Sequence, residues 1–193
     1  GWPAQPESAE TKPKSLLRIS KEEPRIAQID ELLTRAESDP EAIDELGKLG
    51  DPRATETLVR FSRDRERAER AAKALGSIGD PRSAERLVEM LLESNRPSTL
   101  DAVKEALVAM GPEVLDEVTD ALHECTADQK RHVLSVLGRI GDASTVRVLT
   151  DEIENGLNSR RADYDMPNAI RALGQIGRTA VPELLRLLKE NRH

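Results

Sequence analysis

Residue types that could carry out catalysis are few in this sequence, and their spacing brings none of them together. The three histidines, His123, His132 and His193, lie on different predicted elements, and no two share the i, i+4 spacing of a helical metal site. The sequence has no H-E-x-x-H, G-x-S-x-G or phosphate-loop motif. Cys125 is the single cysteine, so no internal disulfide can form, and we expect it to be a packing residue. We therefore expect no enzymatic activity and no metal or cofactor.

Acidic residues, in contrast, are spaced as a binding surface would be. Glu113, Asp116, Glu117, Asp120 and Glu124 fall at i, i+3, i+4, i+7 and i+11, which places them in one stripe along one helix. Like charges four residues apart destabilise a helix by about 0.2–0.5 kcal/mol per pair, so folding alone does not require the stripe. Two interpretations stay open: a solvated face that confers solubility, and an acidic groove for a basic segment of a protein or peptide partner.

The composition favours packed helices and limits the classes of partner. Aromatic residues make up only 2% of the chain, so the core must be aliphatic, which is typical of helices rather than sheets. A net charge of −7 argues against binding to nucleic acid or to an anionic membrane surface. No apolar run approaches the roughly 20 residues of a membrane-spanning helix. Because the chain begins with Gly1, a removed signal peptide stays open; a cytoplasmic location is slightly favoured over a secreted or periplasmic one.

A repeating unit organises most of the chain. Five turn glycines recur at intervals of 29 to 36 residues: Gly50, Gly79, Gly111, Gly141 and Gly177. A repeat period of this length is the signature of a solenoid. We predict a flexible tail over 1–20 and a single repeat domain over 21–193. Within that domain we expect a cap helix over 24–37 and helix pairs over about 40–62, 67–94, 99–124, 127–155 and 165–190.

The turn chemistry explains how each pair forms. A glycine can close the first helix in the left-handed conformation, after which Asp51, Asp80 or Asp142 can cap the second helix. Thr126 with Gln129, and Ser98 with Asp101, resemble capping boxes.

Glycines also recur inside the first helices, at positions 47, 76, 138 and 174, where each costs about 1 kcal/mol relative to alanine. This repeated cost predicts close helix contacts there. Val108 replaces the glycine in the third unit, which is therefore the atypical one.

The motif A-L-G-x-I-G-D-P, complete over Ala74–Pro81 and partly present over 137–142 and 173–177, resembles the HEAT-like repeats of the phycobilisome-lyase type over about residues 24–188. The resemblance implies an all-α, right-handed α-solenoid (an armadillo-like superhelix) of five helix pairs, whose second helices line a concave face. HEAT-like deoxyhypusine hydroxylases carry several His-Glu pairs on first helices, whereas here His123-Glu124 stands alone at the end of a second helix. We therefore expect a non-catalytic scaffold that binds a protein or peptide through the concave face. The alternative is a chromophore-lyase-like accessory subunit that acts on a phycobiliprotein or a similar prosthetic-group protein.

Candidate partner-binding residues are those predicted to line the groove, together with a tyrosine in the long link before the fifth pair: Arg82, Arg86, Glu113, Asp116, Glu117, Asp120, Arg147 and Tyr164. A second charged cluster, Arg63, Arg65, Arg67 and Arg70, alternates with acidic residues, which favours a salt-bridged loop over a phosphate site. The last helix is more apolar than a terminal cap should be, which indicates self-association or a longer array.

Overall fold

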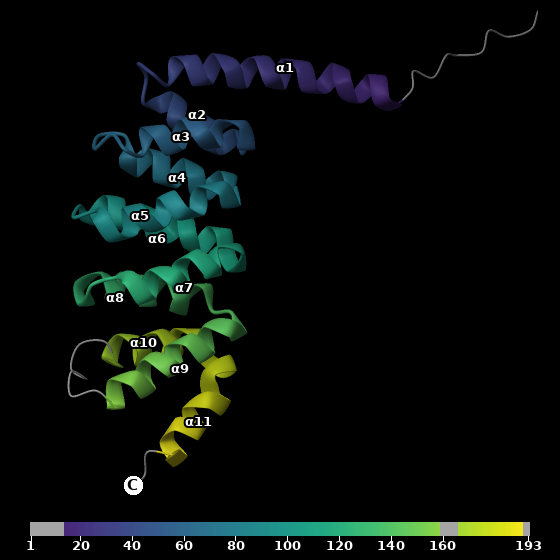
Figure 1. Ribbon diagram of the computed structural model, residues 1–193. Coiled ribbons are helices and arrows are strands. Elements are labelled where there is room, and N and C mark those ends of the chain that lie inside the picture. The colour runs from purple at the N-terminus through teal and green to yellow at the C-terminus, as the bar shows by residue number, and fades with distance from the viewer. Residues whose placement is uncertain (1–13, 159–165, 191–193) are drawn as a thin grey trace, which may run out of the picture.

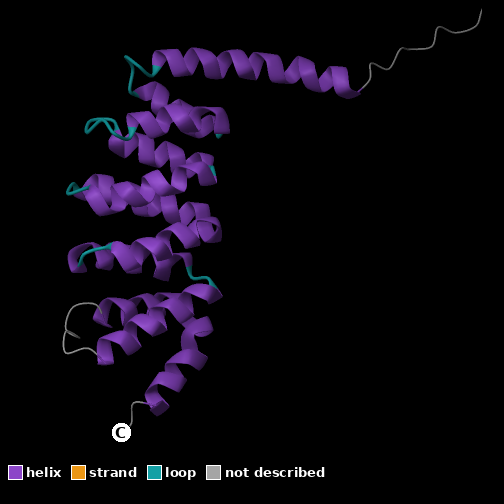
Figure 2. Cartoon of the chain, viewed as in Figure 1, coloured by secondary structure: helices purple, strands orange, loops and turns teal. Residues whose placement is uncertain are grey.

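The computed structural model describes residues 14–158 and 166–190 (Figure 1). Over these residues every regular element is helical and the loops between them are short, as Figure 2 shows. The α-helices are α1 Lys14–Arg35, α2 Glu41–Leu49, α3 Thr55–Phe61, α4 Ala68–Ile78, α5 Ala84–Glu93, α6 Pro97–Met110, α7 Leu115–Glu124, α8 Ala127–Ile140, α9 Ala143–Asn158, α10 Met166–Ile176 and α11 Val181–Glu190.

The helix pairs stack in chain order as an all-α solenoid, which confirms the predicted fold class (Figure 1). In each pair the even-numbered helix, α2 to α10, comes first, and the odd-numbered helix, α3 to α11, comes second. Successive first helices pack on one another along the stack. The long helix α1 lies across one end and projects beyond it, and α11 closes the described part at the other end (Figure 1).

The predicted turn chemistry is present in the structure. Gly79 ends α4 in the left-handed conformation, with φ of 68°, and its amide bonds to the Leu75 carbonyl. The Asp80 carboxylate then accepts a hydrogen bond from the Arg82 amide at 3.1 Å, and Pro81 occupies the first position of a short 3-10 helix that leads into α5. The same arrangement recurs at Asp51.

Three of the four glycines inside the first helices make the predicted close contacts, each with an alanine of the next first helix: Gly47, Gly76 and Gly138. The prediction is wrong for Gly174, whose Cβ position has nothing within 4 Å. A Cβ built on Gly47 would lie 2.8 Å from the Cα of Ala74, and the same distance for Gly138 and Ala172 is 2.6 Å. Real Cβ atoms essentially never approach backbone that closely. The missing side chains therefore allow the backbones of neighbouring first helices to approach each other.

The joint between α6 and α8 departs from this rule. Val108 occupies the position in α6 that a glycine occupies in the other first helices. Val136 occupies the position in α8 that corresponds to Ala74 in α4, two residues before the internal glycine. Two β-branched side chains replace a glycine and an alanine, so these two helices adjoin over a smaller part of their length than α4 and α6 do. The third unit is thus atypical in its packing as well as in its sequence.

The predicted boundary between tail and cap helix is wrong. Helix α1 begins at Lys14, so residues 14–20, assigned to the tail, are helical, and the helix continues through Pro24 to Arg35. Proline fits best in the first turn of a helix, which is why the sequence suggested a start there. The segment before it is rich in leucine, lysine and glutamate, which are good helix formers, and it extends the helix instead. The rest of the predicted tail, 1–13, lies outside the described residues.

Candidate binding site

The acidic stripe lies on one side of α7 and on the 3-10 turn Gly111–Val114 that precedes it. The opposite side of this segment is apolar, and Val114, Val118 and Leu122 are buried in the core. Because these three residues are spaced four apart, they fix the rotation of α7 and turn the acidic positions outward. Glu117 is half-buried. The other four stripe residues are exposed: Glu113, Asp116, Asp120 and Glu124.

The stripe carboxylates are unpaired within the part of the chain that the structure describes. Elsewhere in the stack, acidic side chains meet basic ones across repeats, such as Glu105 with Arg139 at 2.7 Å and Glu152 with Lys130 at 2.9 Å. None of the five stripe residues forms such a pair within 14–158 or 166–190. The Oε2 atom of Glu117 is buried and accepts no hydrogen bond. A buried carboxylate oxygen without a donor is unusual in a folded protein.

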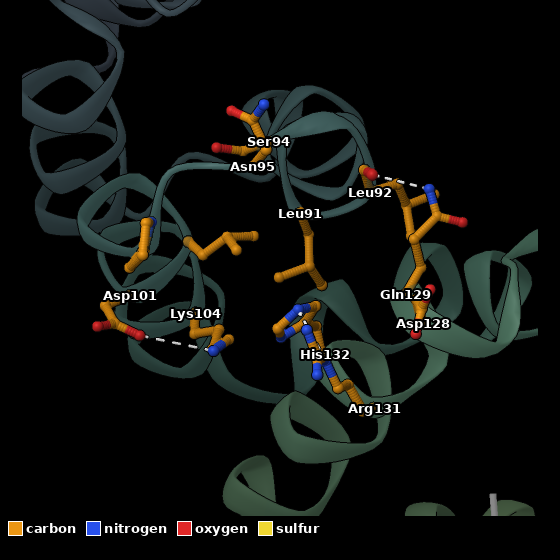
Figure 3. A pocket seen from close by; sticks show the side chains of 12 residues that line it. Leu91, Leu92, Ser94, Asn95, Asp101, Lys104, Asp128, Gln129, Arg131 and His132 are labelled. Carbon is orange, nitrogen blue, oxygen red and sulfur yellow. Dashed lines mark hydrogen bonds and ion pairs between the residues drawn. The ribbon is translucent and has the colours of Figure 1, made fainter. Parts of the chain in front are cut away.

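A cavity of about 590 Å³ lies where the end of α5 and the start of α6 meet α8 (Figure 3). We call it the α5–α8 cavity. It is lined by apolar side chains such as Leu91 and by polar ones such as Lys104 and His132. Its volume falls within the range of about 300–1,000 Å³ that is typical of ligand pockets. The cavity adjoins the interface between α6 and α8, the two helices that adjoin over a smaller part of their length. The sequence did not predict this cavity.

Hydrogen bonds and charges fix the polar wall of the α5–α8 cavity. Gln129 donates to the Leu92 carbonyl at 2.7 Å, which ties the start of α8 to the end of α5 (Figure 3). Lys104 lies 3.5 Å from Asp101. Burial, together with the positive charges of Lys104 and Arg131, lowers the pKa of His132 below its usual value and so favours the neutral imidazole. The wall therefore offers hydrogen-bonding groups of both charge signs beside an apolar surface, which suits binding.

Two protein-family models agree with this architecture. The family described as HEAT repeats matches residues 29–108, and the family described as PBS lyase HEAT-like repeat matches residues 168–190. The chain is a HEAT-like repeat protein. A solved structure of human deoxyhypusine hydroxylase in complex with glycerol is 20% identical to it, with a TM-score of 0.41, over 86% of this chain and 79% of that chain. No sequence among the curated proteins matches.

Two of the predicted groove residues of this HEAT-like array already form hydrogen bonds and ion pairs within the chain. Arg82 pairs with Asp80 and also donates to the Pro52 carbonyl at 3.1 Å, which joins the first two repeats. The hydrogen bond from Arg82 lowers the pKa of Asp80 to about 2. Arg86 donates to the hydroxyl of Ser62 at 2.9 Å and also pairs with Glu89. A partner would have to displace these bonds.

Of the two other candidates outside the acidic stripe, the structure describes one. Arg147 is exposed on α9 and forms no ion pair within the described residues. Tyr164 lies outside the described residues. Cys125 is half-buried and packs against the core, and its Sγ lies 3.4 Å from the Leu122 carbonyl oxygen.

The described residues contain no cluster of three or more histidine, cysteine or acidic side chains that could hold a metal ion. Nor is any helix among them long and apolar enough to cross a membrane.

Proposed function

We propose that this HEAT-like repeat protein is a non-catalytic scaffold that binds a protein or peptide partner through the acidic stripe of α7. The proposal rests on one observation: five aligned carboxylates, including the buried and unsatisfied Oε2 of Glu117, have no ion-pair partner within the described residues. A lysine- or arginine-bearing segment supplies the missing donors. In the HEAT-like family that this chain resembles, second helices line a concave face, so the proposed binding surface is the concave face with α7 on it.

The energetics of α7 support a binding role over a purely solvating one. Carboxylates four residues apart on one helix repel each other, and Asp116 and Asp120 form such a pair. Solubility requires charge but not charge of one sign along one stripe, since mixed charges solvate a surface equally well. A basic partner would relieve the repulsion and gain complementary charge at the same time.

The test compares two double reversals that change the net charge equally. Asp116→Lys with Asp120→Lys alters the stripe at two exposed positions, and Glu31→Lys with Glu66→Lys alters two exposed acidic residues outside it. The probe is a fluorescein-labelled eight-residue peptide that contains four lysines, and binding is measured by anisotropy at several salt concentrations. We expect the stripe variant to bind at least tenfold more weakly, and the control to bind nearly as well as the wild type, with affinity falling as salt rises.

Two results would contradict the proposal. Equal loss in both variants would mean that the peptide responds only to net charge, and the stripe would then be a solvated face. Retention of the wild-type protein on double-stranded DNA at low salt would identify nucleic acid as the partner instead. Circular dichroism of each variant confirms that helicity is unchanged.

A further inference from the structure

A second cavity, of about 250 Å³, has the opposite electrostatic character to the acidic stripe. It lies between the connection that follows α3, the body of α5 and the start of α6. Glu93 is the single acidic residue among its lining side chains. Four arginines also line it: Arg63, Arg65, Arg86 and Arg96. We call it the arginine cavity. Such a concentration of positive charge is unexpected in a protein whose net charge is −7.

The arginine cluster forms only part of the salt-bridged loop that the sequence predicted. Arg67 pairs with Asp64 at 3.6 Å, and Arg70 pairs with Asp44, so these two fit that interpretation. Arg63 and Arg65, by contrast, are exposed and form no ion pair within the described residues.

The other two arginines shape the wall of the cavity. Arg96 donates one bond, of 2.6 Å, to the Arg65 carbonyl, which folds its side chain over the connection after α3. Arg86 is largely buried and is held by Ser62, Glu89 and Glu93. Arg63, Arg65 and Arg96 thus line the cavity and form no ion pair with a carboxylate among the described residues.

The N-terminus of α6 opens at the same place. The predicted capping box of Ser98 and Asp101 is absent: α6 begins one residue earlier, at Pro97, and its N-cap residue, Arg96, provides no side-chain cap. The first turn also lacks an acidic residue. The amides of Ser98 and Thr99 therefore have no side-chain acceptor, and the positive end of the helix dipole adds to the charge of the arginines.

An unused donor in the cavity wall is the independent sign of a missing ligand. Thr99 lines the arginine cavity and is only 2% exposed, yet its hydroxyl has no hydrogen-bond partner. Buried hydroxyls in folded proteins are nearly always satisfied. The Glu69 carboxylate lies near the start of α6, but it is bonded to Lys73 at 2.7 Å and to the side chain of Ser98, and it forms no hydrogen bond with Thr99.

We propose that the arginine cavity binds a phosphate monoester. A doubly charged tetrahedral oxyanion matches several guanidinium forks and the free amides of a helix N-terminus at once. The volume admits a phosphoryl group and the first atoms of its carrier, but it is small for a nucleotide or a comparable cofactor. This site is separate from the acidic stripe and does not depend on it.

Titration calorimetry of the full chain with three probes tests the proposal: inorganic phosphate, glycerol phosphate, and a phosphoserine peptide with its unphosphorylated counterpart. The variant Arg63→Gln with Arg65→Gln removes two exposed guanidinium groups that carry no structural ion pair. Arg171→Gln with Arg178→Gln changes the charge equally at two exposed arginines of the last repeat. We expect the first variant to lower affinity for the phosphorylated probes at least tenfold, and the second to leave it unchanged.

Thr99→Val gives a second readout, because it keeps the shape of the side chain and removes only the hydroxyl. We expect weaker phosphate binding with no loss of thermal stability, since the hydroxyl has no partner in the free protein. If glycerol phosphate binds as tightly as the phosphopeptide, the carrier is a small molecule; if the peptide binds more tightly, it is a phosphorylated protein. If the phosphorylated and unphosphorylated peptides bind equally, or if the Arg63/Arg65 variant binds phosphate like the wild type, the proposal is overturned.

Discussion

Gly76 of α4 faces Ala106 of α6 so closely that a Cβ on the glycine would lie 2.5 Å from the alanine Cα. The same relationship joins two other pairs of first helices, through Gly47 with Ala74 and Gly138 with Ala172. Gly174, the corresponding residue of α10, has nothing within 4 Å of its Cβ position. One sequence motif therefore occurs in two environments, tightly packed inside the stack and open at its end.

These two environments predict stability changes of opposite sign for the same substitution. Gly76→Ala forces a methyl group into helix backbone, and we expect it to lower the free energy of unfolding by about 1–3 kcal/mol despite the better helix propensity of alanine. Gly174→Ala meets open space, so it should raise the free energy of unfolding by about 0.5–1 kcal/mol. Urea denaturation followed by circular dichroism measures both. Destabilisation by Gly174→Ala would show that another element covers α10.

Asp80 links the first two repeats in a pH-dependent way. Its buried carboxylate accepts hydrogen bonds from the Arg82 side chain and, at 2.8 Å, from the Thr55 hydroxyl. The Arg82 bond is the main reason that the pKa of Asp80 lies at about 2, below its ordinary value of 3.8. A lowered pKa means that the folded state resists protonation. The stabilisation is therefore complete above about pH 4 and is lost as the pH falls towards 2.

We accordingly expect Asp80→Ala to lower the free energy of unfolding by about 1–2 kcal/mol at pH 7, the usual cost of losing a helix cap. The difference from the wild type should shrink steadily between pH 4 and pH 2. Asp80→Asn, which keeps a capping oxygen but not the charge, should cost less. Urea denaturation across this pH range measures the differences, and a constant difference down to pH 2 would contradict the assignment.

The exposed apolar side of α11 predicts concentration-dependent self-association. Leu185 is 51% exposed and Leu188 is 63% exposed, and Ile170 of α10, the first helix of the same repeat, is also exposed. Leu185→Lys with Leu188→Lys should therefore shift sedimentation towards the monomer. Ile26→Lys, at an exposed apolar position at the opposite end of the stack, is the matched control and should leave the distribution unchanged. A wild-type chain that stays monomeric at high concentration would refute the idea.

The fold was predictable because the signals for it are local. A glycine followed by aspartate and proline sets the turn, and the same motif recurs along the chain. The stripe of α7 was predictable for the same reason, since helical spacing alone aligns its members. The start of α1 was not, because Pro24 imitates a helix start inside a helix.

The cavities depend on contacts between residues that are distant in the sequence. Val108 identified the third unit as atypical, but the α5–α8 cavity needs three helices to be placed together before it exists. The arginine cavity was masked by charge alternation, since Arg63 and Arg65 have acidic neighbours in sequence that do not pair with them in space. Groove positions such as Arg86 were likewise assigned without knowledge of their partners inside the chain.

A single substitution in the stripe should separate folding from binding. Asp120 lies four residues after Asp116 and four before Glu124, so Asp120→Lys replaces two repulsive pairs by two attractive ones. We expect it to raise the free energy of unfolding by about 0.5–1 kcal/mol at low salt, and the gain should diminish as salt screens the charges. The same substitution should weaken capture of the lysine-containing peptide. Glu31→Lys, on the distant helix α1, should leave peptide binding unchanged. Greater stability together with weaker binding would show that the array retains the stripe at a cost to its own folding, whereas unchanged peptide binding would leave α7 as a solvated helix.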